Sequence, residues 1–161
     1  MHPRAGELIQ LLKLEPHPEG GYFVQTFRSS LNVKPSDSRD RRTALTVIYF
    51  LLLQGGISRW HRVLSDEAWH WYEGYSLELF TAPSDTGVVR SFVLGPLSSG
   101  TAPQQVVPAG HWQAARATGA YSLVGCSVGP GFEYSDFTLL ASLPDYERPH
   151  LTPSLLATEL V

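Results

Sequence analysis

The fold is decided by the central stretch of the chain, which reads ALTVIYFLLLQGGISRWHRVLSDEAWHWYEG over residues 44–74. Residues 44–53 are apolar at nearly every position, which is typical of a strand that is covered on both faces, by a helix or by another subunit. Two shorter β-rich segments follow at 58–63 and 68–73, and Gly, Ser and Asp separate them. The stretch therefore predicts consecutive strands, not alternating strands and helices.

Outside this stretch the same pattern continues in both directions. Short β-rich runs bounded by turn residues predict further strands at 22–28, 76–81, 88–94, 104–107, 111–117, 120–128 and 133–140. Leu8, Leu11 and Leu12 have helical spacing, so residues 4–14 predict a short amphipathic helix that ends before the turn at 16–21. We therefore expect one all-β domain over residues 1–161, a barrel or sandwich at 22–140 with a short N-terminal helix. A tail at 144–161 wraps the surface before a last helical turn.

Composition excludes several classes of function. The formal net charge is -3, with no long block of one sign, which argues against nucleic acid as a partner. The longest apolar run is about half as long as a membrane helix, and no secretory signal is recognised, so we expect a cytoplasmic protein without a membrane partner. Cys126 is the only cysteine, which excludes an internal disulfide and a thiol-rich metal site.

A polar loop at 31–42 is expected to be mobile and to act as a lid. It contains the one dense basic patch, at 39–42. Two interpretations remain open for this patch: a solvated loop, or a contact for an anion at the mouth of a pocket.

The candidate site lies around His61 and Glu67, which flank a short Ser-Asp turn and so are expected at adjacent strand ends. A barrel can bring Gln113 or His111 to the same place from a distant strand. Imidazole and carboxylate together suit Zn, Fe, Mn or Ni. Side chains alternate along a strand, so if Glu67 points inward, His70 points outward unless a bulge intervenes.

Aromatic residues are unusually dense near this site, at Trp60, Trp69, Trp71 and Tyr72. One interpretation is that they form the barrel core. The other is that they line a pocket for a flat or sugar-like ligand, with histidine and glutamate as its few polar anchors. Both can hold, because the interior of a small barrel is its core as well as its pocket.

At these residues the chain resembles the cupin superfamily. Cupins carry a first motif, G(x)5HxH(x)3-4E(x)6G, and Gly55, His61, Glu67 and Gly74 fall into its register, with Val63 in place of the second histidine. The second cupin motif is partly matched by the residues 108–110. Three residues after them, Gln113 stands at the position where the motif has its histidine. More specifically, the chain resembles the DUF985 (cupin_5) subfamily, in blocks that extend from about residue 8 to 140: 16–23, 48–52, 65–70, 108–113, 123–132 and 136–137.

This resemblance implies a jelly-roll barrel, commonly a homodimer, with one pocket per subunit. It also implies a fold similar to that of sugar-nucleotide epimerases of the dTDP-4-dehydrorhamnose 3,5-epimerase kind, which are metal-free and use a histidine base. The apolar residues on both faces of 22–28 likewise suit contact with another subunit.

Three hypotheses about function follow. The first is a metal-dependent cupin enzyme, a dioxygenase or isomerase, in which His61, Glu67 and Gln113 bind one divalent transition metal. It is weakened because two of the usual three histidines are absent and a glutamine amide is a weaker ligand.

The second hypothesis is an isomerase, epimerase or lyase without a cofactor, acting on a carbohydrate-like or other small polar substrate. His61 is the general base, Glu67 orients it or acts as the partner acid, and Tyr72 or Tyr49 donates a proton to the opposite face. Arg59 or Arg62 would hold an anionic group. The expected ligand-binding residues are Tyr49, Arg59, Trp69, His70, Trp71 and Gln113. The third hypothesis is a non-catalytic module that binds a small molecule in the same pocket.

Overall fold

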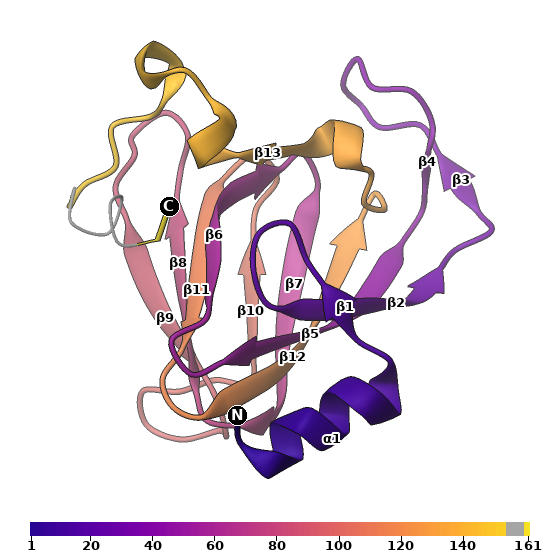
Figure 1. Cartoon of the computed structure of the whole chain (residues 1–161). Helices are drawn as coiled ribbons and strands as arrows, with labels where there is room; N and C mark the ends of the chain where they lie inside the picture. The colour runs from indigo at the N-terminus through magenta and orange to yellow at the C-terminus, as the bar shows by residue number, and fades with distance from the viewer. Residues whose placement is uncertain (154–159) are drawn as a thin grey trace.

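Two antiparallel sheets face each other in the computed structural model, which describes residues 1–153 and 160–161 (Figure 1). The six-stranded sheet has the order β1 (Glu15–Pro16), β2 (Tyr22–Arg28), β5 (Thr46–Leu53), β12 (Tyr121–Gly129), β7 (Asp66–Gly74) and β10 (Gln104–Val107). The five-stranded sheet has the order β13 (Phe137–Leu139), β6 (Ile57–Val63), β11 (Trp112–Ala117), β8 (Leu77–Ala82) and β9 (Arg90–Leu94). A ribbon of β3 (Asn32–Val33) and β4 (Arg42–Thr43) stands beside them. The predicted all-β sandwich with one N-terminal helix is confirmed.

The apolar run of β5 is buried on both faces. Phe50 and Leu52 point between the sheets and belong to the inner core. Leu51 points outward, where Ala5 and Leu8 of helix α1 (Pro3–Leu12) cover it, and Figure 1 shows α1 below β2, β5 and β12. The helix therefore supplies the second cover that the sequence of β5 requires. It ends two residues earlier than expected, because Lys13 adopts a left-handed conformation with φ of 55°.

A second apolar cluster lies on the outer face of the five-stranded sheet. Trp60 and Trp112 of this sheet pack there with Leu151 and Leu160 of the C-terminal tail. The tail is tied to the sheet by a hydrogen bond from the Trp60 amide to the Leu160 carbonyl, 2.8 Å. A short 3-10 turn, η3 (Asp145–Glu147), begins the tail. The helical turn expected near its end falls within 154–159, outside the described residues.

The segment at 133–140 differs from the single strand that the sequence predicts. It forms a 3-10 turn, η1 (Tyr134–Asp136), then the short β13, then a second 3-10 turn, η2 (Leu140–Ser142). The buried carboxylate of Asp136 explains this shape, because Arg39 and Arg42 both bind it, with N–O distances of 3.0 and 2.8 Å. Figure 1 shows this segment crossing one end of the sandwich.

The same ion pairs place the 31–42 loop. Arg39 also donates to Ser65 Oγ, 3.0 Å, and hydrogen bonds, those from Arg42 foremost, hold the pKa of Asp136 below its usual range. The loop is therefore anchored beside the 134–137 segment. Arg39 and Arg42 of the basic patch bind a protein carboxylate, an alternative that the two sequence-based interpretations did not include.

The edge of the six-stranded sheet is only partly covered. In the described chain β1 pairs with Tyr22 and Phe23 alone, and Phe27 farther along β2 is 50% exposed. A homodimer formed at this edge stays a prediction. No helix among the described residues is long and apolar enough to cross a membrane.

Candidate functional site

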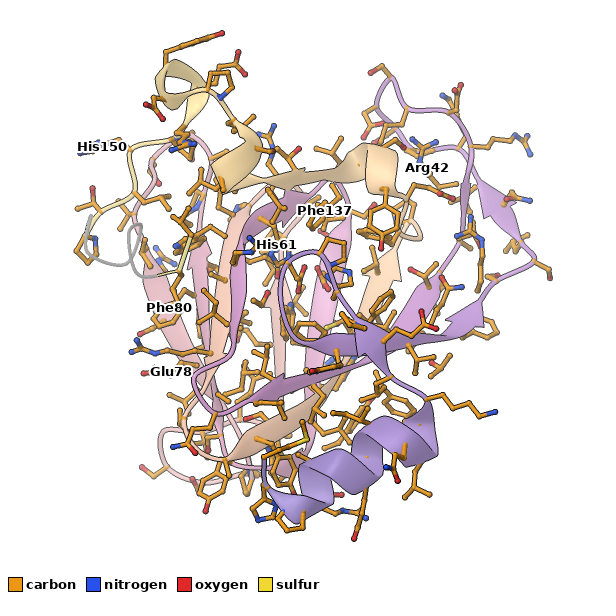
Figure 2. The ribbon with its side chains drawn as sticks, in the orientation of Figure 1. Arg42, His61, Glu78, Phe80, Phe137 and His150 are labelled. Atoms are coloured by element: carbon orange, nitrogen blue, oxygen red, sulfur yellow. The ribbon has the colours of Figure 1, made fainter. Side chains whose placement is uncertain are left out.

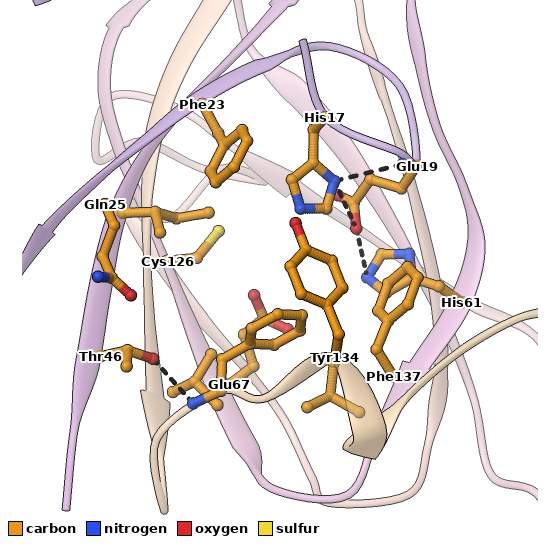
Figure 3. Close-up of a pocket in the computed structure, with 14 residues that line it drawn as sticks. His17, Glu19, Phe23, Gln25, Thr46, His61, Glu67, Cys126, Tyr134 and Phe137 are labelled. Atoms are coloured by element: carbon orange, nitrogen blue, oxygen red, sulfur yellow. Dashed lines mark hydrogen bonds and ion pairs between the residues drawn. The ribbon is translucent and has the colours of Figure 1, made fainter. Parts of the chain in front are cut away.

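A cavity of about 260 Å³ opens between the two sheets, at the end that the 132–137 segment crosses. Its lining comes from both sheets and from two connecting segments: His17, Glu19, Phe23, Gln25, Thr46, Ile48, His61, Val63, Glu67, Cys126, Val128, Phe132, Tyr134 and Phe137. Figure 3 shows these side chains around the hollow. Aliphatic and aromatic groups dominate, and the titratable groups are few and buried, which is the usual character of a small-molecule site.

The tight turn between β1 and β2 brings Glu19 to this cavity. The turn is closed by a hydrogen bond from the His17 amide to the Gly21 carbonyl, 3.0 Å, and Gly20 has φ of 111°. A Cβ on Gly20 would lie 2.1 Å from the Ile57 carbonyl oxygen, so only glycine lets the turn pack this closely on β6. The Glu19 side chain is 9% exposed as a result.

Glu19 and His61 form a buried pair. Glu19 Oε2 lies 3.2 Å from His61 Nε2, and Ser58 Oγ donates to Glu19 Oε1, 2.8 Å. His61 Nδ1 lies 2.7 Å from the Arg59 carbonyl oxygen. Because a carbonyl can only accept, Nδ1 carries a proton and Nε2 is left to share a second one with Glu19. The favoured state of the pair therefore holds one proton between carboxylate and imidazole.

His17 lies on the other side of Glu19 and has the opposite tautomer. Its Nδ1 accepts a hydrogen bond from the Glu19 amide, 3.3 Å, and lies 3.6 Å from Glu19 Oε2. A nitrogen that accepts has no proton, so the neutral ring of His17 carries its proton on Nε2. Its edge-to-face contact with Phe23, with ring centroids 4.5 Å apart, holds the ring in this orientation.

Glu67 enters the cavity from the facing sheet and is held by a directional chain of hydrogen bonds. Trp69 Nε1 donates to Gln113 Oε1, 2.9 Å, and Gln113 Nε2 donates to Glu67 Oε2, 2.6 Å. An indole N–H can only donate, so the orientation of the glutamine amide is determined. Glu67 Oε2 is therefore an acceptor, and a proton on Glu67 would be carried by Oε1.

Burial controls the pKa values of two carboxyls and two imidazoles that line the cavity. Desolvation raises the pKa of Glu19 and of Glu67, because the carboxylate form loses its hydration. Desolvation lowers the pKa of His17 and of His61, because the charged imidazolium form loses its hydration. The Glu67 carboxylate partly opposes this effect on His61. Burial therefore favours the neutral forms of these four groups, which is a common feature of sites that transfer protons.

The donor groups do not fit the metal site expected from the first cupin motif. Glu19 Oε2 is directed at two imidazole nitrogens, and the Gln113 carbonyl oxygen, the atom that would bind a metal, accepts from Trp69 instead. Within residues 1–153 and 160–161, no three His, Cys, Asp or Glu side chains are placed to hold one ion. His61 Nδ1 and Nε2, Glu67 Oε2 and the side-chain amide of Gln113 are thus directed at other protein groups, and these residues do not form the expected set of metal ligands.

Comparisons with known proteins place this chain in a family. The model of the cupin superfamily family Cupin_5 (DUF985) matches residues 6–140. The chain is a cupin of this family. It is similar to the solved structure of protein SO0799 from Shewanella oneidensis, with 33% identity, a TM-score of 0.82 and coverage of 97% of this chain and 96% of that one. A hypothetical protein from Leishmania major is 35% identical, with a TM-score of 0.77 and coverage of 83% and 85%. An uncharacterized protein of Saccharomyces cerevisiae is 29% identical over 96% of this chain and 83% of its own length.

Several expected site residues of this cupin point away from the cavity. Tyr72, the expected proton donor, is 46% exposed and makes an edge-to-face contact with Tyr49 on the opposite face of the sheet. His70 lies on that face too, with Nε2 3.5 Å from Ser127 Oγ. The reason is strand alternation, which puts Glu67 inward and His70 and Tyr72 outward.

The other expected ligand-binding residues lie in the interior without lining the described cavity. Trp69 is 1% exposed in the inner core, and Trp71 packs against the same core while its Nε1 donates to the Tyr75 carbonyl, 3.2 Å. Gln113 is buried behind Glu67. These residues support the site from behind, because the indole ring of Trp69 fills the space between the sheets.

The arginines expected to hold an anionic group have other partners. Arg59 donates to the carbonyl oxygens of Pro18 and Glu19 and so fixes the turn. Arg62 points to the outer face, where its guanidinium lies 5.1 Å from the ring centre of Trp112. His111, considered as a ligand, lies in the turn after Pro108, to whose carbonyl oxygen its amide donates.

Reasoning from the sequence missed several residues that line the cavity, among them His17, Glu19 and Tyr134. The first two belong to the segment PHPEGG at 16–21, whose prolines and glycines predict only a turn that ends the helix. A histidine and an acid between prolines and glycines in one tight turn is the signal that could have identified them, since loops held on a rigid scaffold often carry function.

Figure 2 shows the neighbouring pair His61 and Phe137, whose ring centroids are 5.4 Å apart.

Proposed function

We propose that this cupin is an enzyme that moves protons on a small polar substrate, as an isomerase, epimerase or lyase. One observation carries the proposal: Glu19 Oε2 lies 3.2 Å from His61 Nε2 in an apolar cavity that also holds a second buried carboxyl, Glu67. Two acid–base groups with pKa values shifted by burial in one cavity are characteristic of proton-transfer sites.

The base is the pair, because His61 alone has no nitrogen without a protein partner. Nδ1 is bound to the Arg59 carbonyl and Nε2 faces Glu19. In the base form the carboxylate faces the lone pair of Nε2, and this repulsion favours uptake of a proton from a substrate C–H group. His61 is thus a partner of Glu19, in place of the independent base that the sequence suggested.

Glu67 is the corresponding acid. His61 comes from the five-stranded sheet and Glu67 from the six-stranded sheet, so the two approach the cavity from opposite sheets. A substrate between them gives one proton to the Glu19–His61 pair and receives one from Glu67 Oε1 at a second position. The proton count is conserved: the pair gains what Glu67 loses. After the product leaves, the pair gives its proton to water and Glu67 takes one up from water, which restores the enzyme.

Deuterium exchange tests the proposal without a known substrate. The protein is incubated in D₂O with hydroxyacetone, dihydroxyacetone and aminoacetone, whose C–H groups beside the carbonyl are acidic, and incorporation is followed by NMR. We expect exchange above the uncatalysed rate with at least one of them. Glu19→Gln and Glu67→Gln should each reduce it by about 10²- to 10⁴-fold.

The matched control is Glu15→Gln, the same change at an exposed position of the same chain segment. It should exchange as the wild type does. If no compound exchanges, or if Glu19→Gln exchanges as fast as the wild type, the proposal is wrong. Compound binding without exchange would then favour a non-catalytic ligand-binding protein.

A further inference from the structure

The cavity has acids but no permanent cation. Its lining, taken from the residues that the structure describes, includes no arginine or lysine, and residues 154–159 contain neither type. The nearby arginines have other partners: Arg59 binds backbone carbonyls, while Arg39 and Arg42 bind Asp136. An anionic ligand would therefore lose its hydration without gaining a charged partner.

Counting protons gives the net charge of the cavity. The Glu19–His61 pair with its shared proton is neutral in total, and His17 is neutral because its Nδ1 accepts from an amide. In the proposed reaction either the pair or Glu67 has lost one proton, so the net charge is -1 before and after the transfer. A ligand with one positive charge would neutralise the cavity in both states.

Three aromatic rings on one side of the cavity also favour a positively charged ligand. Phe132, Tyr134 and Phe137 come from one short segment and make edge-to-face contacts with one another, with interplanar angles of 82°, 66° and 83°. Rings at such angles present faces and edges in several directions, and ring faces attract ammonium groups. The anchoring of Asp136 by Arg39 and Arg42 keeps this segment in place.

We propose that the ligand of this cavity is a small compound with one positive charge, an amine or a quaternary ammonium, next to the group that reacts. The volume of about 260 Å³ restricts it to a small molecule, since pockets for drug-sized ligands begin at about 300 Å³. This inference rests on the proposed function, because it concerns the same cavity, and it adds the class of the substrate. It replaces the anionic group that the sequence led us to expect near Arg59 or Arg62.

Three probes of nearly equal shape test the charge. Choline carries a trimethylammonium group, 3,3-dimethyl-1-butanol is its neutral counterpart, and 3,3-dimethylbutanoate is an anion of similar size. Binding to the wild-type protein is measured by calorimetry. We expect choline to bind at least about tenfold more tightly than the alcohol, and the anion to bind most weakly.

Variants identify the groups responsible. The double variant Glu19→Gln with Glu67→Gln removes the negative charge in both states and should remove most of the preference for choline, whereas Glu15→Gln should keep it. Phe132→Leu should weaken choline more than the alcohol, and the control Phe27→Leu, on the exposed part of β2, should weaken neither.

The inference is overturned if the alcohol or the anion binds as tightly as choline, if choline does not bind, or if the double variant keeps the full preference. These results are independent of deuterium exchange. If the protein binds the neutral alcohol more tightly than choline, and deuterium exchange still depends on Glu19, only the inference about ligand charge is wrong. Choline selectivity without any exchange would remove only the proposed catalysis.

Discussion

Glu67 shows how a single buried carboxyl connects function with stability. Its pKa is raised, first of all by desolvation, while the hydrogen bond from Gln113 partly stabilises the charged form. An ionised carboxylate in an apolar cavity costs folding free energy that a neutral amide of the same shape does not. Glu67→Gln should also keep the hydrogen bond from Gln113, through the new side-chain carbonyl oxygen.

We therefore predict that Glu67→Gln becomes more stable relative to the wild type as pH rises. Above the unfolded-state pKa near 4.5 the unfolded chain loses the proton while the folded protein keeps it, so wild-type stability falls until pH passes the raised folded pKa. The difference grows by at most about 1.4 kcal/mol per pH unit. Urea unfolding at several pH values between about 5 and 8 measures it. A difference that does not change with pH would contradict the assignment.

At the scale of elements, the turn at 16–21 decides where the acid of the site lies. The amide of Arg59 donates to the Glu19 carbonyl, 2.8 Å, and joins the turn to β6. The close approach depends on Gly20, whose missing side chain leaves room for the Ile57 carbonyl. Gly55 offers a comparison, because it also has a positive φ, 73°, but nothing lies within 4 Å of a Cβ placed there.

These two glycines make a matched pair of substitutions. Gly55→Ala should cost about 1–2 kcal/mol of unfolding free energy from backbone strain alone. Gly20→Ala should cost more, because the turn must also move away from β6, and it should lower deuterium exchange by separating Glu19 from His61. Urea unfolding and the exchange assay measure the two effects. Equal losses of stability in the two variants would show that the contact with Ile57 does not matter.

At the scale of the whole molecule, the outer faces of both sheets are covered by other segments of the chain, and the cavity lies between the sheets. Helix α1 covers the outer face of the six-stranded sheet, and the tail covers that of the five-stranded sheet. The inner core fills the remaining space between the sheets, up to the cavity end. The hydrogen-bonded network at that end uses the donor atoms that would otherwise bind a metal.

We therefore expect that adding Zn²⁺, Mn²⁺, Fe²⁺ or Ni²⁺ to chelator-treated protein leaves its Tm unchanged. A site filled at one hundred times its Kd would add about 2.7 kcal/mol and raise the Tm by several degrees. Thermal unfolding with and without each ion measures this, and mass spectrometry measures retained metal. A stoichiometric ion that raises the Tm of the wild type but not of Glu19→Gln would contradict the expectation.

Most of the strands could be predicted from the sequence, because alternation and turn residues are local signals. β2 and β10 have the predicted bounds, and most other strands agree within two residues. Three two-residue strands, β1, β3 and β4, were not predicted. The segment 133–140 also differs, because the distant Arg39 and Arg42 determine its shape through Asp136. No local pattern indicates an ion pair between residues almost one hundred positions apart.

The all-β fold and the family resemblance could be read from the sequence. So could the opposite directions of Glu67 and His70, since the period of two along a strand is a property of the backbone. Only the tertiary structure decided which groups meet in the cavity. It brought Glu19 to His61 from 42 positions away, turned Tyr72 to the outer face, and bound Arg59 and Arg62 elsewhere. The reason is physical: strand alternation is set by neighbours along the chain, whereas the chemistry of a site depends on long-range pairing that brings distant segments together.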